Sequence, residues 1–138
     1  MSTELDDALI KTLQRFDTPT VCNALELLIP ERRGYGFTTS QLVCTRPELP
    51  PMIGYARTAT IRAAHPSDLS GQEARALSDN YYEYIDRGSK PSIAVIQDLD
   101  GNNGYGCLWG EVNSNIHMGF GCQGVITDGG VRDVPDIA

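Results

Sequence analysis

An arginine and an aspartate stand side by side near the end of the sequence, within the stretch GCQGVITDGGVRDVPDI from residue 121 to residue 137. Arg132 offers a planar guanidinium group that can pair with a keto oxygen or a carboxylate and stabilise charge that develops there. Asp133 offers hard oxygen ligands, which suit Mg²⁺ or Mn²⁺. A simpler interpretation stays open, because an acid at a helix start favours the helix dipole while the arginine points to solvent.

A second group suited to anions precedes this pair. Residues 109–118 are expected to form a helix, and its first N–H groups, at about Gly110, Glu111, Val112 and Asn113, would lack partners within the helix. A 2-oxo acid fits this arrangement, since its carboxylate and keto oxygen chelate a divalent ion, which then acts as an electron sink for cleavage between C3 and C4. Glu111 is a candidate to orient a water molecule, or is simply a first-turn acid.

The elements that position these groups follow an α/β pattern. Residues 92–98 and 124–127 are apolar and β-branched, as in buried strands, and the helix at 109–118 joins them. This order predicts a right-handed βαβ unit with parallel strands. The carboxyl ends of both strands then face the same edge, where we expect the loop after Asp98, the helix start and the Arg-Asp pair to converge. The glycines of the turn at 128–130 are expected to take positive φ.

Periodicity and turn residues predict four further elements. These are a helix at 4–16, a helix capped by Thr18 that ends at Pro30, a strand at 52–64, and a helix at about 69–87 with Gly88 as its C-terminal cap.

Composition narrows the class of protein. With 138 residues, 41% hydrophobic and 21% charged, the chain is expected to form one soluble globular domain. A net charge of -7 argues against nucleic acid as a partner, because phosphate binding needs a basic face. No apolar run is long enough for a membrane span. The four cysteines lack C-x-x-C spacing and no signal peptide precedes them, so we expect reduced cysteines in a cytoplasmic protein.

The stretch GVITDGGVRDVPDI, preceded by LWGEVN, closely resembles the 4-hydroxy-4-methyl-2-oxoglutarate aldolase family, which also contains the regulator of ribonuclease activity A. FDTPTVCNALELL and IGYARTATIRA resemble the N-terminal helix and a G-x-A-x-T strand of that family, so the resemblance runs from about residue 16 to the end. It implies a swivelling β/β/α fold, with a layered sheet like that of phosphohistidine domains and N-terminal helices. It also implies a homotrimer or a homohexamer.

The resemblance also implies roles for individual residues. Gly110, Glu111, Val112 and Asn113 would contact the substrate, Arg132 would bind it, Asp133 would bind the divalent metal partly through water, and the turn at Gly129 and Gly130 would present the pair. The first hypothesis is a class II aldolase that uses Mg²⁺ or Mn²⁺ to cleave a 4-hydroxy-2-oxo acid to pyruvate, with oxaloacetate decarboxylation as a second activity. Arg132 and Glu111 are its catalytic residues. The alternative is a non-catalytic regulator that inhibits an RNA-degrading enzyme through its acidic surface.

The sequence departs from the family in one respect. Family members usually continue beyond this last motif, whereas this chain ends at Ala138. We therefore expect a single domain over residues 1–138 that is truncated on its C-terminal side relative to the family. It is either a fragment of a longer product or a shortened member. If the missing part is absent in fact, we expect an incomplete core, exposed sheet edges and impaired activity.

Overall fold

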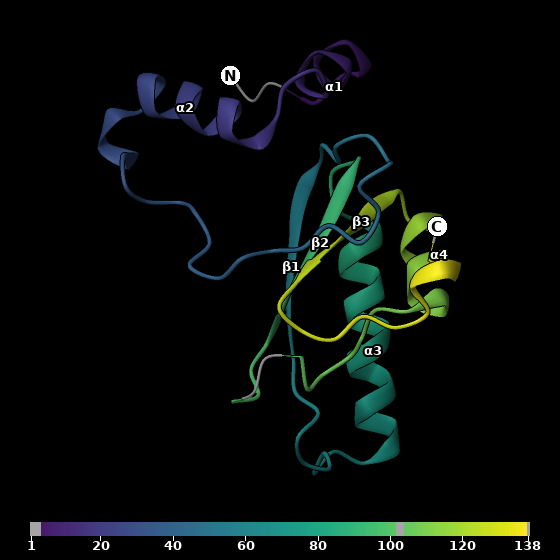
Figure 1. Ribbon diagram of the computed structural model, residues 1–138. Coiled ribbons are helices and arrows are strands. Elements are labelled where there is room, and N and C mark those ends of the chain that lie inside the picture. Colours follow the sequence, from purple (N-terminus) through teal and green to yellow (C-terminus); the bar gives the residue numbers. More distant parts are fainter. Residues whose placement is uncertain (1–3, 102–103, 138) are drawn as a thin grey trace. The chain divides into compact units, whose positions relative to one another are not determined.

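The computed structural model describes residues 4–101 and 104–137, and the chain divides into two compact units, Met1–Pro51 and Met52–Ala138 (Figure 1).

The first unit contains α1 (Asp7–Leu13), α2 (Thr18–Leu28) and the 3-10 helix η1 (Pro30–Arg32). The carboxylate of Asp17 accepts the N–H of Thr20 at 2.9 Å, so Asp17 caps α2. The prediction of Thr18 as the cap is therefore wrong by one residue, because Asp17 satisfies a free donor of the first turn and Thr18 is already helical. None of the described residues between 4 and 51 is buried, so this unit has no core of its own among them.

The second unit is built on a parallel sheet. Its strands are β1 (Tyr55–Ile61), β2 (Ser92–Asp98) and β3 (Cys122–Thr127), in the order β1-β2-β3. Two helices connect them, α3 (Gly71–Asp86) and α4 (Glu111–Gly119), and the short 3-10 helix η2 (Val134–Asp136) follows β3. The α/β class and the parallel pairing are confirmed, while the swivelling β/β/α arrangement stays a prediction.

Local contacts explain where α3 begins and ends. Ser70 and Glu73 form a capping box, in which the Ser70 hydroxyl accepts the N–H of Glu73 and the Glu73 carboxylate accepts the N–H of Ser70. At the other end Arg87 is the cap, with a right-handed helical backbone. The prediction of Gly88 as the cap is therefore wrong by one residue. A Cβ at this glycine would lie 2.6 Å from Nε of Arg57, so it makes room for that side chain.

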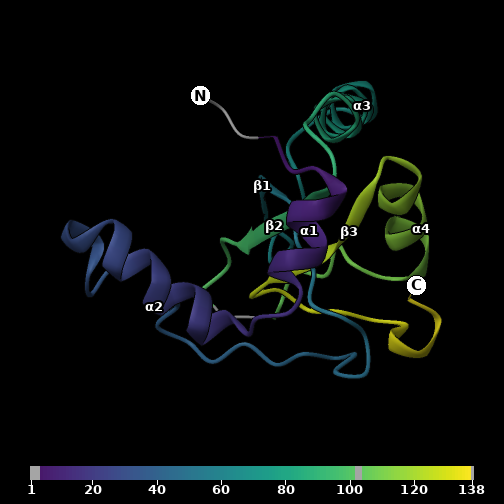
Figure 2. The same cartoon turned by 90° about the horizontal axis from the view of Figure 1, so that it is seen from above.

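The main core cluster joins residues of β2 and β3 to Trp109, which precedes α4. Its buried members are Ala94, Ile96, Trp109 and Cys122. Helices α3 and α4 lie on the same side of the sheet in both views (Figures 1 and 2). Strand β1 alternates between half-buried and exposed residues, as expected for an edge strand with one covered face. In the described part of the chain, no helix is both long and apolar enough to cross a bilayer.

Candidate functional site

The segments that follow β2 and β3 continue side by side beyond the strands. Trp109 and Val131 form a parallel bridge, and the N–H of Arg132 donates to the carbonyl of Trp109 at 3.1 Å. Closer to the strands, the N–H of Gly130 donates to the carbonyl of Gly106 at 2.6 Å. The parallel pairing of two strands therefore brings the start of α4 next to the Arg132-Asp133 pair, which is the convergence expected from the βαβ order.

The two glycines after β3 allow this close approach. A Cβ on Gly129 would lie 2.8 Å from the carbonyl oxygen of Gly106, and one on Gly130 would lie 3.1 Å from that of Gly104. Their expected positive φ is wrong, because in the described residues after β3 the left-handed conformation falls on Asp133, with φ 55° and ψ 34°. The glycines serve backbone packing, and the left-handed residue lies four positions after Gly129.

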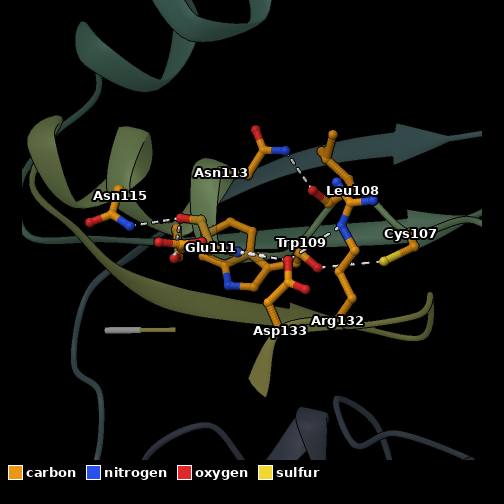
Figure 3. Close-up of polar contacts among 9 residues, drawn as sticks. Cys107, Leu108, Trp109, Glu111, Asn113, Asn115, Arg132 and Asp133 are labelled. Atoms are coloured by element: carbon orange, nitrogen blue, oxygen red, sulfur yellow. Dashed lines mark hydrogen bonds and ion pairs between the residues drawn. The ribbon is translucent and has the colours of Figure 1, made fainter. Parts of the chain in front are cut away.

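Arg132 and Asp133 pack directly against Gly110 at the start of α4. Figure 3 shows the pair beside Trp109 and Glu111. A Cβ on Gly110 would lie 2.8 Å from both Cγ of Arg132 and Oδ2 of Asp133. The same Oδ2 accepts the N–H of Glu111 at 3.4 Å and lies 3.6 Å from Nε of Arg132. A guanidinium group, a carboxylate and a helix N-terminus thus meet at one place, and the absence of a side chain at residue 110 makes this possible.

The backbone of Asp133 is unusual for a residue with a side chain. Left-handed φ is uncommon outside glycine, and Asp and Asn are among the few residues that tolerate it. Such conformations persist where the surrounding structure fixes them, and they gather at binding sites and active sites. This observation, together with the packing on Gly110, marks the Arg132-Asp133 pair as the candidate site.

Comparison with known proteins identifies the family of the chain. The RraA-like family model, described as Aldolase/RraA, matches residues 18–138, which is most of the chain and includes the whole candidate site. The chain belongs to the RraA-like family. Comparison with curated proteins found no match, and neither did comparison with solved structures. The family includes metal-dependent aldolases and non-catalytic regulators of ribonucleases.

In this RraA-like chain the row of donors at the start of α4 is only partly free. The N–H of Glu111 already faces Asp133, whereas the N–H groups of Val112 and Asn113 have no acceptor within the helix because they belong to its first turn. Val112 is 66% exposed, so this end of the helix is open to solvent. Two backbone donors at this helix start are therefore without an acceptor among residues 4–101 and 104–137, and Asp133 lies beside them.

The side chains of Asn113 and Glu111 in this turn differ in whether they are hydrogen-bonded within the protein. Asn113 donates through Nδ2 to the carbonyl of Leu108 at 2.6 Å and accepts at Oδ1 from the Tyr82 hydroxyl at 2.8 Å. Its amide is thus engaged within the protein, unlike the direct substrate contact that the resemblance implies for this position. The Glu111 carboxylate has no hydrogen bond or ion pair with any residue that the structure describes, so it is available to solvent or to a ligand.

The acids at the end of β2 organise the loop and take no part in the site. Asp98 is buried and accepts the N–H groups of Asp100 and Gly106, at 3.0 and 2.8 Å. These backbone hydrogen bonds hold the pKa of the Asp98 carboxyl below its usual value. Asp128 in turn accepts the N–H of Asp98 at 2.7 Å and so joins the ends of β2 and β3. Residues 102 and 103 of this loop lie outside the described residues.

The side chain of Asp133 suits a divalent ion that keeps several water ligands. Across residues 4–101 and 104–137 there is no group of three or more His, Cys, Asp or Glu side chains that could enclose a metal. Mg²⁺, however, usually keeps several waters and takes only one or two protein carboxylates, with substrate filling other positions. The Asp133 side chain is 45% exposed and only its Oδ2 is engaged with Arg132 and Glu111, which suits that mode of binding.

Sequence reasoning missed the polar contacts that join α3 to this site. The hydroxyls of Tyr81 and Tyr82 on α3 each have a partner on α4, His117 for Tyr81 and Asn113 for Tyr82. An aromatic cluster at a helix end indicates that the side chains pack. It does not indicate the hydrogen-bond partner of each hydroxyl, because that depends on how the two helices lie against each other.

Proposed function

We propose that this RraA-like chain is a divalent-metal-dependent aldolase that cleaves a 4-hydroxy-2-oxo acid to pyruvate and a carbonyl fragment. Membership in a family that contains such lyases supports this proposal. The observation that carries it is the packing of Arg132 and Asp133 on Gly110, since a Cβ at residue 110 would come within 2.8 Å of both side chains. This arrangement supports the proposal because recognition of one small acid would need a cation, a hard anion and backbone donors close together.

In the proposed reaction the C3–C4 bond breaks and its electron pair passes into the pyruvate enolate. The proton of the C4 hydroxyl leaves as C4 becomes a carbonyl, and C3 later takes up a proton. Arg132, whose side chain is 66% exposed, pairs with the substrate and stabilises the negative charge of the enolate. The free N–H groups of Val112 and Asn113 hold the substrate carboxylate. Glu111 positions the water molecule that takes the hydroxyl proton.

Asp133 would hold the divalent ion, Mg²⁺ or Mn²⁺, which when bound supplies Lewis-acid stabilisation of the enolate. Loss of CO₂ from oxaloacetate produces the same enolate, so oxaloacetate decarboxylation is the second activity we propose for this site.

The alternative is a non-catalytic regulator of a ribonuclease, the other kind of protein in this family. Two contacts favour it: Asp133 caps the first N–H of α4 and lies 3.6 Å from Arg132, so each side chain has a structural role without any substrate. The net charge of -7 also suits binding to a basic enzyme.

A pyruvate-release assay with and without Mg²⁺ or Mn²⁺ separates the two functions. Asp133→Asn is the informative variant, because Asn tolerates left-handed φ and keeps the size of the side chain but loses the charge. We expect metal-dependent turnover to fall on the order of 100-fold or more, as for loss of a metal ligand. Asp136→Asn is the matched control, since it removes the same charge from an exposed neighbour, and its turnover should equal that of the wild type.

The outcomes point in different directions. Turnover that needs metal and is lost in Asp133→Asn but kept in Asp136→Asn supports the aldolase. Equal turnover in Asp133→Asn and the wild type removes Asp133 as the metal ligand. No turnover on any 2-oxo acid, combined with tight binding to a ribonuclease, favours the regulator.

A further inference from the structure

Two side chains from different helices form a short chain of hydrogen bonds that ends beside the candidate site. The Tyr82 hydroxyl on α3 donates to Oδ1 of Asn113 on α4 at 2.8 Å. The other end of the same amide, Nδ2, donates to the carbonyl of Leu108 at 2.6 Å (Figure 3). Both side chains are half-buried, so an amide that lost either partner would not be fully compensated by water.

Leu108 belongs to the segment that the site depends on. Its carbonyl is held by Asn113, and the next carbonyl, that of Trp109, accepts the N–H of Arg132 at 3.1 Å. Two adjacent carbonyl groups are thus each held by a hydrogen bond, one from a helix side chain and one from the backbone that carries the Arg-Asp pair. The following residue is Gly110, on which Arg132 and Asp133 pack without spare room.

We propose that Tyr82 is a positioning residue for the candidate site, acting through Asn113 and Leu108 to hold Gly110 against Arg132 and Asp133. The effect of Tyr82 on turnover rests on the proposed function, because it follows only if the Arg-Asp pair acts on a substrate. The effect of Tyr82 on the geometry of the segment does not depend on what the site does.

Tyr81 supplies the matched control. It is the neighbouring residue on α3, it is also half-buried, and its hydroxyl is bonded to Nε2 of His117 on α4 at 2.8 Å. Tyr81→Phe and Tyr82→Phe therefore remove the same atom from the same interface between the helices. The Tyr82 hydroxyl reaches Leu108 through the side chain of Asn113, whereas the Tyr81 hydroxyl reaches only the backbone carbonyl of Asn113, through His117.

Amide hydrogen exchange of the Arg132 N–H measures the geometry directly, because this group is bonded to Trp109. In Tyr82→Phe we expect its exchange to be roughly tenfold faster, the effect of losing one partly buried hydrogen bond. In Tyr81→Phe it should match the wild type. Unchanged exchange in Tyr82→Phe, or an equal increase in both variants, would overturn the proposal.

Asn113→Leu, which keeps the side-chain volume and removes both hydrogen bonds, completes a double-mutant cycle. If Tyr82 acts through Asn113, the substitution Tyr82→Phe should add nothing to the exchange rate of Arg132 in the Asn113→Leu background. Additive effects would show that Tyr82 acts by another route and would overturn the proposed path.

Pyruvate release and Mn²⁺ affinity then test whether the positioning by Tyr82 affects the proposed reaction. We expect Tyr82→Phe to lower turnover and to weaken Mn²⁺ binding by a factor of several, while Tyr81→Phe changes neither although it costs similar stability. Faster Arg132 exchange in a protein whose wild type shows no turnover would overturn the proposed function and leave the positioning of the segment supported. Normal exchange, turnover and Mn²⁺ binding in Tyr82→Phe would overturn the positioning role alone.

Discussion

Gly110 is the residue at which a single methyl group should matter most for the proposed activity. A Cβ there would lie 2.8 Å from both Arg132 and Asp133, closer than ordinary contact allows. In Gly110→Ala we therefore expect the pair to move away from the helix start and pyruvate release to fall by about 100-fold, as for a displacement of about 1 Å in an active site. Crowding of this kind also costs about 1–3 kcal/mol of stability. Turnover and the free energy of unfolding would be measured together.

Gly119→Ala on the same helix controls for the added methyl group. A Cβ at Gly119 would meet nothing within 4 Å, so turnover should stay at the wild-type level. Full activity in Gly110→Ala would show that close contact between residue 110 and the Arg132-Asp133 pair is not required. The packing on Gly110 would then no longer support the proposed function.

The neighbourhood of Arg132, Asp133 and Gly110 could be predicted from the sequence, because parallel strands place their carboxyl ends at one edge of the sheet. The left-handed backbone of Asp133 could not. It was expected at Gly129 and Gly130, which tolerate it most readily, but neither has positive φ and both pack closely on the backbone of the neighbouring segment. Tertiary contacts decide which residue adopts the left-handed conformation, and the local sequence does not show those contacts.

At the scale of elements, the interface between α3 and α4 contains a buried histidine. Nδ1 of His117 lies 2.6 Å from the carbonyl of Asn113, which can only accept, so Nδ1 carries the proton and Nε2 accepts from the Tyr81 hydroxyl. The ring also packs 4.6 Å from that of Trp109. Burial lowers the pKa of His117 below its ordinary value of 6.5, so the native state favours the neutral imidazole.

This lowered pKa predicts a loss of stability in mild acid. Between pH 6.5 and the lower native pKa, the unfolded chain binds a proton that the native protein does not, so stability falls as the pH falls through this window. The stabilisation is complete above pH 6.5, and one proton limits the slope to about 1.4 kcal/mol per pH unit. Denaturant unfolding between pH 5 and 7 would measure it.

His117→Gln is the comparison for this experiment, because it keeps a polar group but does not titrate. Its stability should be flat over the same range, whereas acids with lowered pKa values, such as Asp98 and Glu73, lose their contribution only at lower pH. An equal slope in the variant and the wild type would assign the pH dependence to another group.

Periodicity in the sequence predicted which segments form strands and helices. The ends of a strand depend on the neighbouring strand with which it pairs. The strand at residues 92–98 was predicted with its observed bounds, since its run of apolar residues is central in the sheet. The strand predicted at 52–64 is shorter, Tyr55–Ile61, because β1 pairs only where β2 lies opposite, from Ser92 to Asp98. A sequence shows where a strand is favoured, and its neighbour decides how much of it forms.

At the scale of the molecule, the sequence predicted amphipathic helices in the first unit but not the surface on which they pack. Large hydrophobic side chains remain exposed in this unit, including Leu27 at 79%, Leu28 at 78% and Phe37 at 70%. Exposed apolar surface of this extent is typical of protein interfaces. The single domain over residues 1–138 and the homotrimer or homohexamer both stay predictions, and the second of them can be tested on this surface.

We predict that the protein associates with copies of itself through the apolar side chains of residues 16–49. Light scattering of the purified protein should give the mass of a trimer or a hexamer. A Leu27→Lys, Leu28→Lys double variant should shift it toward the monomer, because two charges would lose hydration in the interface. Leu77→Lys, at a leucine 62% exposed on α3, is the control and should keep the wild-type mass. A monomeric wild type would contradict self-association, and an unchanged mass in the double variant would move the interface away from α2.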